Sequence, residues 1–474
     1  MSLPQEVQVI NVGLSRFADA VRDQGVEVLD VDWRIPAGGD AELVAVLGRL
    51  YGLHSRAIDE ANREVVRRLD EAVPVLVEVA PAAGVIPGLG ERAVLHPGPP
   101  LDWEDFCDPL RRSVRAAVMA EGWASTLEEA ERFVAQGNVQ LEPANHHATV
   151  VPMATALTPS APVFVVENPQ GGNRAYSPLN QGPGKVAWFG VEQPEAIDRL
   201  RWLRDVAAPV LSATLQGVGP VDLFSIAAQG LQMGDDGHMR TQAATNLFVR
   251  HLLPSLVGLE DPRRVEVARF LSANHLFFLN LGMAAAKAVA DWASEVAGSS
   301  VVIGMARNGT TFGIRLGSMS DRRRSRSQAA WFVAAAPAVG DALYYSGFGP
   351  EVGAPDIGDS AVLELVGLGG AAAAASPAIA SFLGGSMSKA IAATDEMDRI
   401  CVSPSSRFKL PFLDFRGSPL GIDVRKVVEL EIAPAINTGI LHASEGVGQV
   451  GAGVARAPLD CFKQALLALD EFYH

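Results

Sequence analysis

The segment Gly234-Asp-Asp-Gly-His238-Met-Arg240 brings two carboxylates, an imidazole and a guanidinium together. We expect it to begin a helix, because Asp235 and His238 are three residues apart and one helical turn would place both on one face. An imidazole oriented by a carboxylate can transfer a proton, and a guanidinium can bind an anion. An aspartate here could simply cap the helix, but a cap explains neither His238 nor Arg240. We therefore predict catalytic roles for Asp235, His238 and Arg240.

A second group with chemical potential is the glycine-rich stretch Gln181-Gly-Pro-Gly184-Lys185. It is not a nucleotide-binding P-loop, because Val186 stands where that motif needs a serine or threonine for Mg²⁺. Gly182 and Gly184 can nevertheless let backbone N–H groups converge on an anion, and Lys185 adds a positive charge. The stretch is thus a candidate anion site, with a plain surface loop as the alternative.

Further candidates for binding or orienting a polar substrate stand between apolar runs. They are His147, Arg307 and Asn308, Asp359 and Ser360 in Pro355-Asp-Ile-Gly-Asp-Ser360, and Asn437 and Thr438 in Asn437-Thr-Gly439. His146 and His147 are adjacent, so their side chains diverge and one of them is structural. Turn chemistry alone explains Asn308, and it is also a sufficient explanation for the two aspartates of the 355–360 segment.

The overall composition limits the classes of partner. The chain has 474 residues and a formal charge of −15, which disfavours nucleic acid and anionic membrane surfaces. Its three cysteines, Cys107, Cys401 and Cys461, are far apart and form no CxxC pair, as expected for a cytoplasmic protein without a disulfide framework or zinc ribbon. No targeting segment is visible. The apolar stretch 365–383 is broken by glycine and proline, which suits close packing inside a protein better than lipid.

The elements that must position these residues follow from hydrophobic periodicity and turn signals. We expect a β-α-β unit over 7–31, a helix capped by Asp40 that runs to about Ala72, a helix beginning at Thr126, and strands at 75–79 and 163–166. The middle of the chain should hold a glycine-rich loop over 171–184 and an almost entirely helical block over 193–294. The last part should hold a hairpin of 301–305 with 311–316, a solvated basic loop at 322–326, and a final helix from Pro458. Asn308-Gly309 suits the type I′ turn of that hairpin.

The predicted fold class is α/β (α+β), with two α/β domains and an additional helical domain between them. The boundaries are 1–192 for the N-terminal domain, 193–297 for the helical domain and 298–474 for the C-terminal domain. Gly446-Val-Gly-Gln-Val-Gly451 matches the dinucleotide fingerprint as a string, but too few residues follow it to form a β-α-β unit. A glycine-rich turn packed against other backbone is the better interpretation.

Taken together, these loops resemble the YlbE-like family, the AllG-type subunit of oxamate carbamoyltransferase, over nearly the whole chain. The matching segments are Ile10-Asn-Val-Gly-Leu14, Val31-Asp-Trp33, Pro36-Ala-Gly-Gly-Asp40, Leu95-His-Pro-Gly-Pro-Pro100, Phe164-Val-Val-Glu-Asn168, Gly184-Lys185, Gln232-Met-Gly-Asp-Asp-Gly-His238, Met305-Ala-Arg-Asn-Gly309, Asp356-Ile-Gly-Asp-Ser360, Arg416-Gly417, Gly421-Ile-Asp423, Asn437-Thr-Gly439 and Gly448-Gln-Val-Gly-Ala-Gly453. Their joint order is more specific than any one of them.

The resemblance implies a role in allantoin and purine nitrogen breakdown, in which oxalurate and phosphate give oxamate and carbamoyl phosphate. It also implies partner subunits of the AllF and AllH types. Phosphate is then a co-substrate, and no other cofactor and no metal is expected. From residue chemistry, we assign Arg240 and Arg307 to anion binding, His238 to proton transfer or carbonyl polarisation, and Asp235 to orienting His238. Lys185 and its neighbouring glycines would hold phosphate.

Two other functions stay open. The chain could be a non-catalytic scaffold subunit, since its abundant glycine and alanine segments suit large interfaces, including self-association. It could also be a metal-dependent hydrolase that uses His147, Asp235, His238 or Asp359. Departures from the family pattern, among them Met239 and Thr241 in place of asparagines, leave a different carbamoyl or acyl acceptor open.

Overall fold

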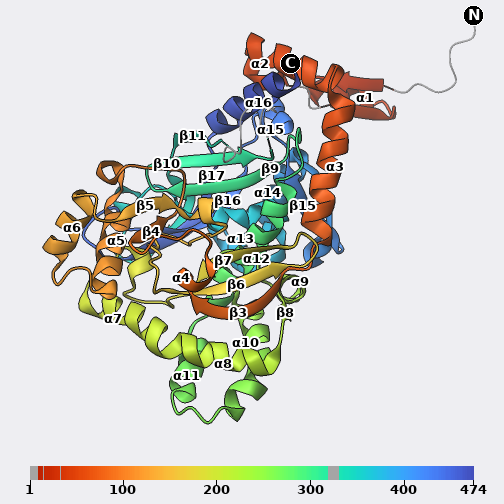
Figure 1. Cartoon of the computed structure of the whole chain (residues 1–474). Coiled ribbons are helices and arrows are strands. Elements are labelled where there is room, and N and C mark those ends of the chain that lie inside the picture. Colours follow the sequence, from red (N-terminus) through yellow and green to blue (C-terminus); the bar gives the residue numbers. More distant parts are fainter. Residues whose placement is uncertain (1–8, 14, 32–33, 319–329) are drawn as a thin grey trace, which may run out of the picture.

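The computed structural model describes residues 9–13, 15–31, 34–318 and 330–474 (Figure 1). The first residues of the chain, Leu14, Asp32, Trp33 and the basic run at 322–326 lie outside the described residues, so the predictions made on them stay predictions. Helices and short strands alternate throughout, which confirms the α/β class.

The helices are α1 (Ser15–Arg22), α2 (Ala41–Gly52), α3 (Ser55–Glu71), α4 (Ala82–Val85), α5 (Asp108–Glu121), α6 (Leu127–Ala135), α7 (Pro194–Trp202), α8 (Ala208–Val218), α9 (Leu223–Gln232), α10 (Gln242–Gly258), α11 (Arg264–Ala273), α12 (Phe277–Ala293), α13 (Pro377–Phe382), α14 (Met387–Ile400), α15 (Val424–Leu430) and α16 (Leu459–Tyr473). Short 3₁₀ turns that matter below are η3 (Ala144–His147), η7 (Ser360–Val362), η8 (Glu364–Val366) and η9 (Gly369–Ala375).

The strands are β1 (Val9–Val12), β2 (Val28–Val31), β3 (Val75–Pro81), β4 (Ala93–His96), β5 (Gln140–Pro143), β6 (Pro162–Asn168), β7 (Asn173–Pro178), β8 (Val221–Asp222), β9 (Val302–Asn308), β10 (Thr311–Leu316), β11 (Phe332–Ala335), β12 (Val339–Tyr344), β13 (Ile357–Gly358), β14 (Cys401–Leu410), β15 (Arg416–Ile422), β16 (Ala435–Leu441) and β17 (Gln449–Arg456). The sheets they form have the orders β7-β6-β3-β8, β11-β10-β9-β13, β12-β17-β16, β14-β15, β4-β5 and β1-β2.

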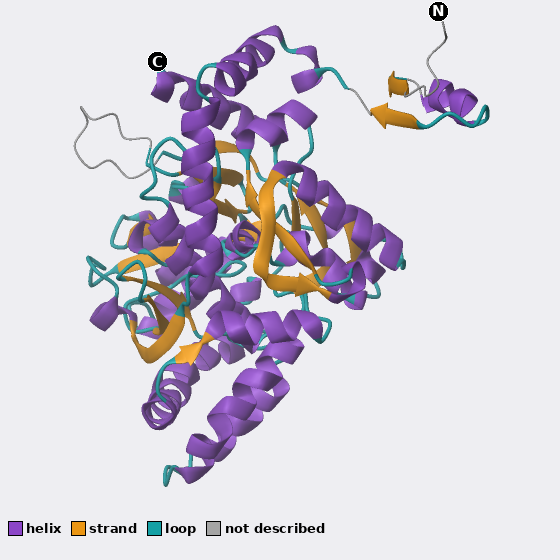
Figure 2. Cartoon of the chain, turned by 90° about the vertical axis from the view of Figure 1, so that its right-hand side faces the viewer, coloured by secondary structure: helices purple, strands orange, loops and turns teal. Residues whose placement is uncertain are grey.

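The β-α-β unit near the N-terminus is present as predicted, with β1 and β2 parallel and α1 between them. Figure 2 shows that this unit stands away from the rest of the molecule. Its apolar side chains Ile10, Val12 and Leu29 are exposed. A two-stranded parallel sheet therefore extends from the body of the protein, and no other described element covers those side chains.

Helix capping follows the sequence closely. The Asp40 carboxylate accepts the N–H groups of Glu42 and Leu43 at the start of α2, at 3.0 and 3.1 Å. Thr126 Oγ1 accepts the N–H of Glu129 at 3.1 Å and so caps α6. The long helix predicted to run to about Ala72 is instead two helices, since α2 ends at Gly52 and α3 begins at Ser55. Glycine at the end of α2 weakens the helix there.

Predicted strands at 75–79 and 163–166 are neighbours in one sheet, where β3 and β6 pair antiparallel. The glycine-rich loop predicted over 171–184 is partly wrong, because it contains strand β7, which pairs with β6. Gly172, with φ of +66°, makes the turn between these two strands. Within this stretch, residues 171–172 belong to that turn and residues 179–184 form a loop.

The predicted hairpin of β9 and β10 is confirmed, with Arg307 opposite Phe312. Its turn is not type I′, because Gly309 has a positive φ of +82° and Asn308 does not. Asn308 instead accepts the N–H groups of Thr310 and Thr311 with its side-chain oxygen, at 3.0 and 2.6 Å. A side-chain hydrogen bond thus replaces the left-handed backbone that the turn prediction required.

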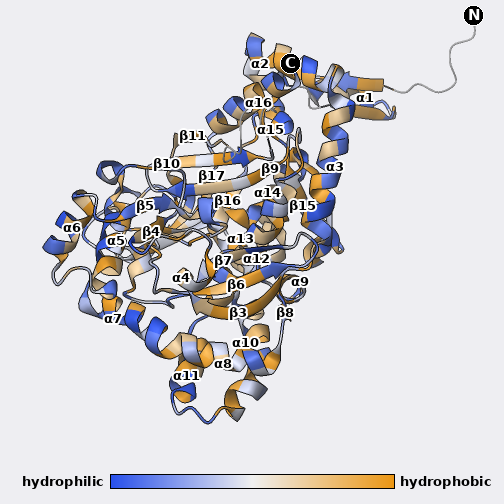
Figure 3. Ribbon diagram, viewed as in Figure 1, coloured by the Kyte–Doolittle hydropathy of each residue, from blue (hydrophilic) through white to orange (hydrophobic). Residues whose placement is uncertain are grey.

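The helical block is present as α7 to α12, interrupted by β8. Its last helix, α12, is buried along almost its whole length and packs against β6 and β7. One hydrophobic cluster includes Leu50, Phe224 and Phe462, one from each predicted domain. Figure 3 shows apolar residues on elements throughout the body of the molecule. The predicted domain boundaries at 192 and 297 stay a prediction, because a hydrophobic core shared by all three predicted domains does not show where one domain ends.

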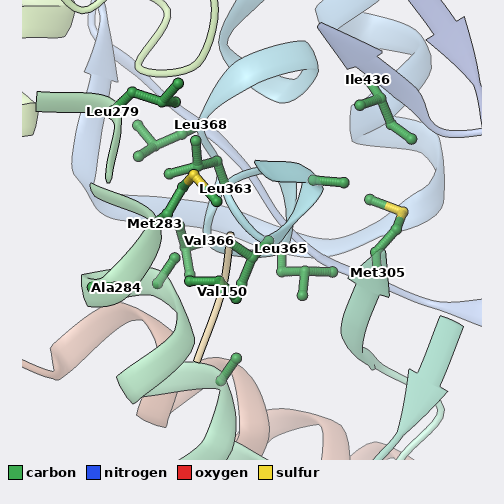
Figure 4. Packing of buried hydrophobic residues seen from close by; sticks show 14 of the residues in the cluster. Val150, Leu279, Met283, Ala284, Met305, Leu363, Leu365, Val366, Leu368 and Ile436 are labelled. Carbon is green, nitrogen blue, oxygen red and sulfur yellow. The ribbon is translucent and has the colours of Figure 1, made fainter. Parts of the chain in front are cut away.

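The apolar stretch 365–383 is packed inside the protein, as predicted. Leu368 of this stretch lies beside Leu279 of α12, and Leu363, just before the stretch, lies beside Met283 of the same helix (Figure 4). Gly370 permits a close approach, because a Cβ at this position would lie 2.2 Å from the carbonyl oxygen of Ala435. Within the described ranges no single helix is long and apolar enough to cross a membrane, although the bent pair α11 and α12, at 82°, meets that test by length and composition.

The Gly446–Gly451 string forms a turn and the start of β17, as the interpretation of a packed glycine-rich turn predicted. A Cβ on Gly451 would lie 2.7 Å from the carbonyl oxygen of Leu343 on the neighbouring β12. The final helix predicted from Pro458 is α16, with Pro458 immediately before it.

Candidate functional site

The segment that holds Asp235 and His238 is a loop between α9 and α10, and not the helical turn that the sequence predicts. Gly237 lies in this loop with φ of +81°. Asp235 accepts the N–H groups of Ala243 and Ala244, at 3.1 and 2.8 Å, so it caps α10 and does not orient His238. Burial raises the pKa of Asp235 to about 6, despite the lowering effect of those two N–H groups.

Asp236 shapes the loop. Its carboxylate accepts the backbone N–H of His238, Met239 and Arg240, the last at 2.7 Å. The side-chain amide of Asn437 donates to the same carboxylate at 2.6 Å. Predicted residues from 235–240 and from β16 are therefore brought together, and Asp236 is the residue that joins them.

His238 finds its carboxylate partner far along the chain. Its Nδ1 lies 2.7 Å from Oε1 of Glu364, and both side chains are buried. The same oxygen accepts the N–H groups of Gly370 and Asn437, at 3.1 and 3.2 Å. Glu364 was not among the predicted residues, although a single acidic residue inside the long apolar stretch 361–375 was a usable signal.

Arg307 is completely buried, and all five of its N–H groups have protein partners. It makes a bidentate ion pair with Asp356 at 2.8 and 2.9 Å. It also donates to the carbonyl oxygen of Gly358 and to the hydroxyls of Ser360 and Thr438. The prediction that Arg307 binds a substrate anion is therefore corrected, because its hydrogen bonds hold β9, β13 and β16 together.

The remaining predicted residues are mostly engaged with the protein. Asp359 accepts the N–H groups of Gly98 and Val151 at 2.8 and 3.0 Å, and burial raises its pKa to about 7. His147 Nε2 lies 2.6 Å from Glu142. In the described part of the chain, no three His, Cys, Asp or Glu side chains gather where they could hold a metal ion.

A cavity of about 650 Å³ lies between the glycine-rich loop, the α11–α12 connection, and β12 with β17. The residues that line it are Gly182, Pro183, Gly184, Lys185, Trp188, Phe189, Met239, Asn274, His275, Leu276, Leu343, Tyr344, Tyr345, Phe382, Val447, Gln449 and Ala452. The volume suits a small molecule, and the lining combines apolar and aromatic walls with a few polar groups. We call it the Lys185 cavity.

The charged groups at the Lys185 cavity are positive. Lys185 is exposed and has no ion pair with any described residue, and no described carboxylate is part of the lining. The side chain of Arg240 is 43% exposed, and its Nε lies 3.7 Å from Oδ1 of Asp235. Burial lowers the pKa of His275, and the positive charge of Arg240 lowers it further. In a chain of net charge −15, this local excess of positive charge favours a small anion.

The glycines around Lys185 act differently from the prediction in one respect. The N–H of Gly182 donates to Oδ1 of Asn180 at 2.9 Å, so it is not free for an anion. Asn180 is itself fixed by Asn274 and Asn280, which belong to the segment leading into α12 and to α12. The loop is thus anchored to the helical block, and Lys185 extends from an anchored loop.

The buried His238 network lies behind the cavity wall. Met239, between His238 and Arg240, lines the cavity, whereas His238 does not. Gln449 also lines it, and a Cβ on Gly439, next to Thr438, would lie 3.1 Å from Nε2 of Gln449. The structure therefore places Lys185, Gly182 and Gly184 at the cavity, Arg240 beside it, and Asn437, Thr438 and His238 behind it.

The mixed sheets, the helical block and the positive cavity define an α/β protein with a candidate site for a small anion. A family model described as "Oxamate carbamoyltransferase subunit AllG" matches residues 139–360. The chain is 41% identical to the oxamate carbamoyltransferase subunit AllG of Escherichia coli K12 over 420 residues, which cover 88% of this chain and 98% of that protein. The chain belongs to the AllG family, as its motifs predicted.

Two other proteins are similar over most of the chain. The uncharacterized protein YahG of Escherichia coli K12 is 35% identical over 472 residues, or 99% of this chain and 98% of YahG. The crystal structure of a conserved protein of unknown function from Enterococcus faecalis V583 superposes with a TM-score of 0.84 at 35% identity, covering 88% of this chain and 99% of that one. The fold of this chain therefore agrees with that of the Enterococcus faecalis protein over most of both chains.

Proposed function

We propose that this chain is the subunit that binds the anionic substrates in an oxamate carbamoyltransferase-like enzyme. In the proposed reaction, phosphate attacks the carbamoyl carbon of oxalurate, the bond from that carbon to the oxamate nitrogen breaks, and the nitrogen takes up a proton. The products are oxamate and carbamoyl phosphate, and the reaction is a step in allantoin and purine nitrogen breakdown. The single observation that carries this proposal is the positive Lys185 cavity in a member of the AllG family.

Each residue at the cavity has a distinct proposed part. Lys185, which is exposed and has no ion pair with a described residue, attracts and holds phosphate or the substrate carboxylate. Arg240 adds a second positive charge beside His275, a neutral hydrogen-bonding group at the wall. His238 and Glu364 are positioning residues, because they fix the loop that carries Met239 and Arg240 without touching the cavity. Partner subunits of the AllF and AllH types would complete the enzyme in the cytoplasm.

The test uses the complex assembled with its partner subunits. Carbamoyl phosphate formed from oxalurate and phosphate is measured for the wild type and for Lys185→Met and Arg240→Met. Lys389→Met, which removes an exposed lysine outside the Lys185 cavity, is the matched control. We expect both cavity variants to lower kcat/KM at least tenfold and the control to leave it unchanged. Equal activity in all four proteins would reject the proposal.

A scaffold role is the second candidate, since the relative is named as a subunit. It is distinguished by direct binding to the isolated chain. If calorimetric titration shows no binding of phosphate or oxalurate, while the chain still assembles with its partners, the scaffold role is the correct one. Binding that Lys185→Met weakens supports the substrate-binding role instead.

A further inference from the structure

His275 lies in the short connection between α11 and α12 and lines the Lys185 cavity. Its backbone is fixed, because its carbonyl oxygen accepts the hydroxyls of Thr241 and Thr245, at 3.4 and 3.2 Å. The residue is exposed, and no hydrogen bond to a described residue holds either ring nitrogen. The imidazole is therefore held at the cavity by its backbone, and its ring is left to contact a bound molecule.

One polar side chain links the segment of His275 to the loop of Lys185. Oδ1 of Asn180 accepts the N–H of Gly182 and the side-chain amide of Asn274, both at 2.9 Å. Gly182 lies in the loop just before Lys185, and Asn274 directly precedes His275. The loop of the lysine proposed to hold phosphate and the segment of the imidazole are thus tied to each other by hydrogen bonds.

The proposed reaction moves one proton between its two substrates. Hydrogen phosphate carries a proton that carbamoyl phosphate no longer has, and the oxamate nitrogen needs a proton when its bond to the carbamoyl carbon breaks. A positioned acid or base typically contributes about 100- to 10,000-fold to the rate of such a step. A single group that accepts the proton from phosphate and donates it to the nitrogen therefore balances the reaction.

Few side chains at the cavity can carry that proton. The titratable side chains among its described lining residues are Lys185, His275, Tyr344 and Tyr345. Burial raises the pKa of both tyrosines, so each keeps its own proton near neutral pH and is a poor acceptor for another. Lys185 supplies the positive charge that holds the anion, and His238 does not line the cavity. His275 is left as the lining side chain that can both accept and donate a proton.

The charges around His275 keep its ring neutral before the reaction. Partial burial lowers its pKa from the ordinary 6.5, and the positive charge of Arg240 lowers it further. Lys185 adds positive charge at the same cavity, Tyr344 and Tyr345 are neutral, and no described carboxylate is part of the lining. A neutral imidazole has a lone pair that accepts a proton. Once protonated beside these positive charges, it is a stronger acid than an ordinary imidazolium and gives the proton up readily.

We propose that His275 is a catalytic residue that carries this proton from hydrogen phosphate to the oxamate nitrogen, while Lys185 holds the phosphate. As the bond from the phosphate oxygen to the carbamoyl carbon forms, a ring nitrogen of His275 takes the phosphate proton. As the bond from that carbon to the oxamate nitrogen breaks, the same ring nitrogen donates the proton to it. One C–O bond forms, one C–N bond breaks, and the imidazole returns to its neutral form. This inference rests on the proposed function and names the group that moves its proton.

The kinetics of His275→Gln test the role in the complex assembled with its partner subunits. Glutamine keeps a hydrogen-bonding side chain at the cavity but cannot carry a proton. We expect kcat to fall about 100-fold or more, with the KM for phosphate within about twofold of wild type, because Lys185 is intact. The matched control is His251→Gln, which removes an exposed histidine of α10 outside the cavity and should change neither constant. An unchanged kcat, or a loss confined to KM, would overturn the proposal.

Rescue by free imidazole separates a proton carrier from a structural side chain. His275→Ala removes the ring from the cavity, and imidazole added to the solution can then take its place. We expect imidazole to raise the rate of His275→Ala about tenfold or more and to leave Lys185→Met unchanged. A rate of His275→Ala that does not respond to imidazole would contradict the role.

NMR titration of the ring protons in the isolated chain gives a readout that needs no activity. The signal that His275→Gln removes should titrate with a pKa below 6.5, and Arg240→Met should raise that pKa. A pKa above 6.5, or one that Arg240→Met leaves unchanged, would remove the electrostatic basis of the proposal.

The kinetic results also distinguish this inference from the proposed function. If the wild-type complex forms no carbamoyl phosphate from oxalurate and phosphate, the proposed function is rejected and the proton role with it. If the wild type is active and Lys185→Met impairs it, while His275→Gln keeps the wild-type kcat, only the proton role is rejected.

Discussion

Nδ1 of His238 and Oε1 of Glu364 lie 2.7 Å apart, although 126 residues separate them in the chain, and both side chains are buried. The same Glu364 oxygen accepts two backbone N–H groups, from Gly370 and Asn437. One carboxylate thus connects the loop after α9, the turn η9 and strand β16. Gly369 is required beside it, because a Cβ there would lie 2.1 Å from that oxygen.

Removing the Glu364 carboxylate should destabilise the protein more than replacing it by a neutral amide. Glu364→Ala leaves three buried donors without a partner, and each unpaired donor costs about 1–3 kcal/mol. Glu364→Gln keeps an acceptor oxygen in place and should lose about half as much. Urea unfolding measures the difference, with the exposed Glu60→Ala as control, where a surface ion pair contributes about 0–1 kcal/mol. Equal losses for the two Glu364 variants would contradict the network.

The Arg307–Asp356 ion pair predicts a larger and asymmetric effect. Arg307→Met leaves the carboxylate of Asp356 buried without its cation, which typically costs about 3–5 kcal/mol. The double variant Arg307→Met with Asp356→Leu should recover part of that loss, because no unpaired charge remains. Denaturation midpoints of the three proteins and of the exposed Arg201→Met decide this. A double variant less stable than Arg307→Met would show that the pair itself, and not the stranded charge, dominates.

Local signals in the sequence predicted local structure well. Asp40 and Thr126 cap their helices because a cap needs only a side-chain oxygen two or three residues before an N–H. The apolar runs at 75–79 and 163–166 gave the correct strands because burial determines their pattern. The turn at Asn308 was wrong in type, since a side-chain hydrogen bond and a left-handed backbone are both open to asparagine.

The candidate site was less predictable because its contacts are long-range. Spacing suggested that Asp235 orients His238, yet the loop turns at Gly237 and the partner is Glu364. Arg307 was assigned to an anion from its chemistry, but only the fold reveals that Asp356 and two hydroxyls take its donors. Lys185 lines the cavity and the charge of Arg240 acts on His275 at its wall, while the roles predicted for both residues stay a proposal.

Lys185→Met should affect binding without affecting stability. The side chain is exposed and has no ion pair among the described residues, so its removal should change the free energy of unfolding by less than about 0.5 kcal/mol. One unit charge near the surface contributes about 1 kcal/mol or more to an anion at 4 Å, which is roughly fivefold or more in affinity for phosphate. Titration at low and high salt checks this, because screening should shrink the difference. A difference that grows with salt would indicate another cause.

The pH dependence of stability should reveal Asp235. Burial raises its pKa from 3.8 to about 6 in the folded protein, so between these values the folded state holds the proton more tightly than the unfolded state. Its stabilising contribution is therefore complete below about pH 4 and is lost as the pH rises through 6. Each tenfold difference in proton affinity between the two states corresponds to about 1.4 kcal/mol. Asp235→Asn cannot ionise; it also weakens the cap on α10, but that loss is the same at every pH.

Urea unfolding at pH 4, 5, 6 and 7 should show the wild type losing stability relative to Asp235→Asn across this range. A constant difference, or a wild type that gains relative to the variant as the pH rises, would show that the two backbone N–H groups, and not burial, govern this carboxyl.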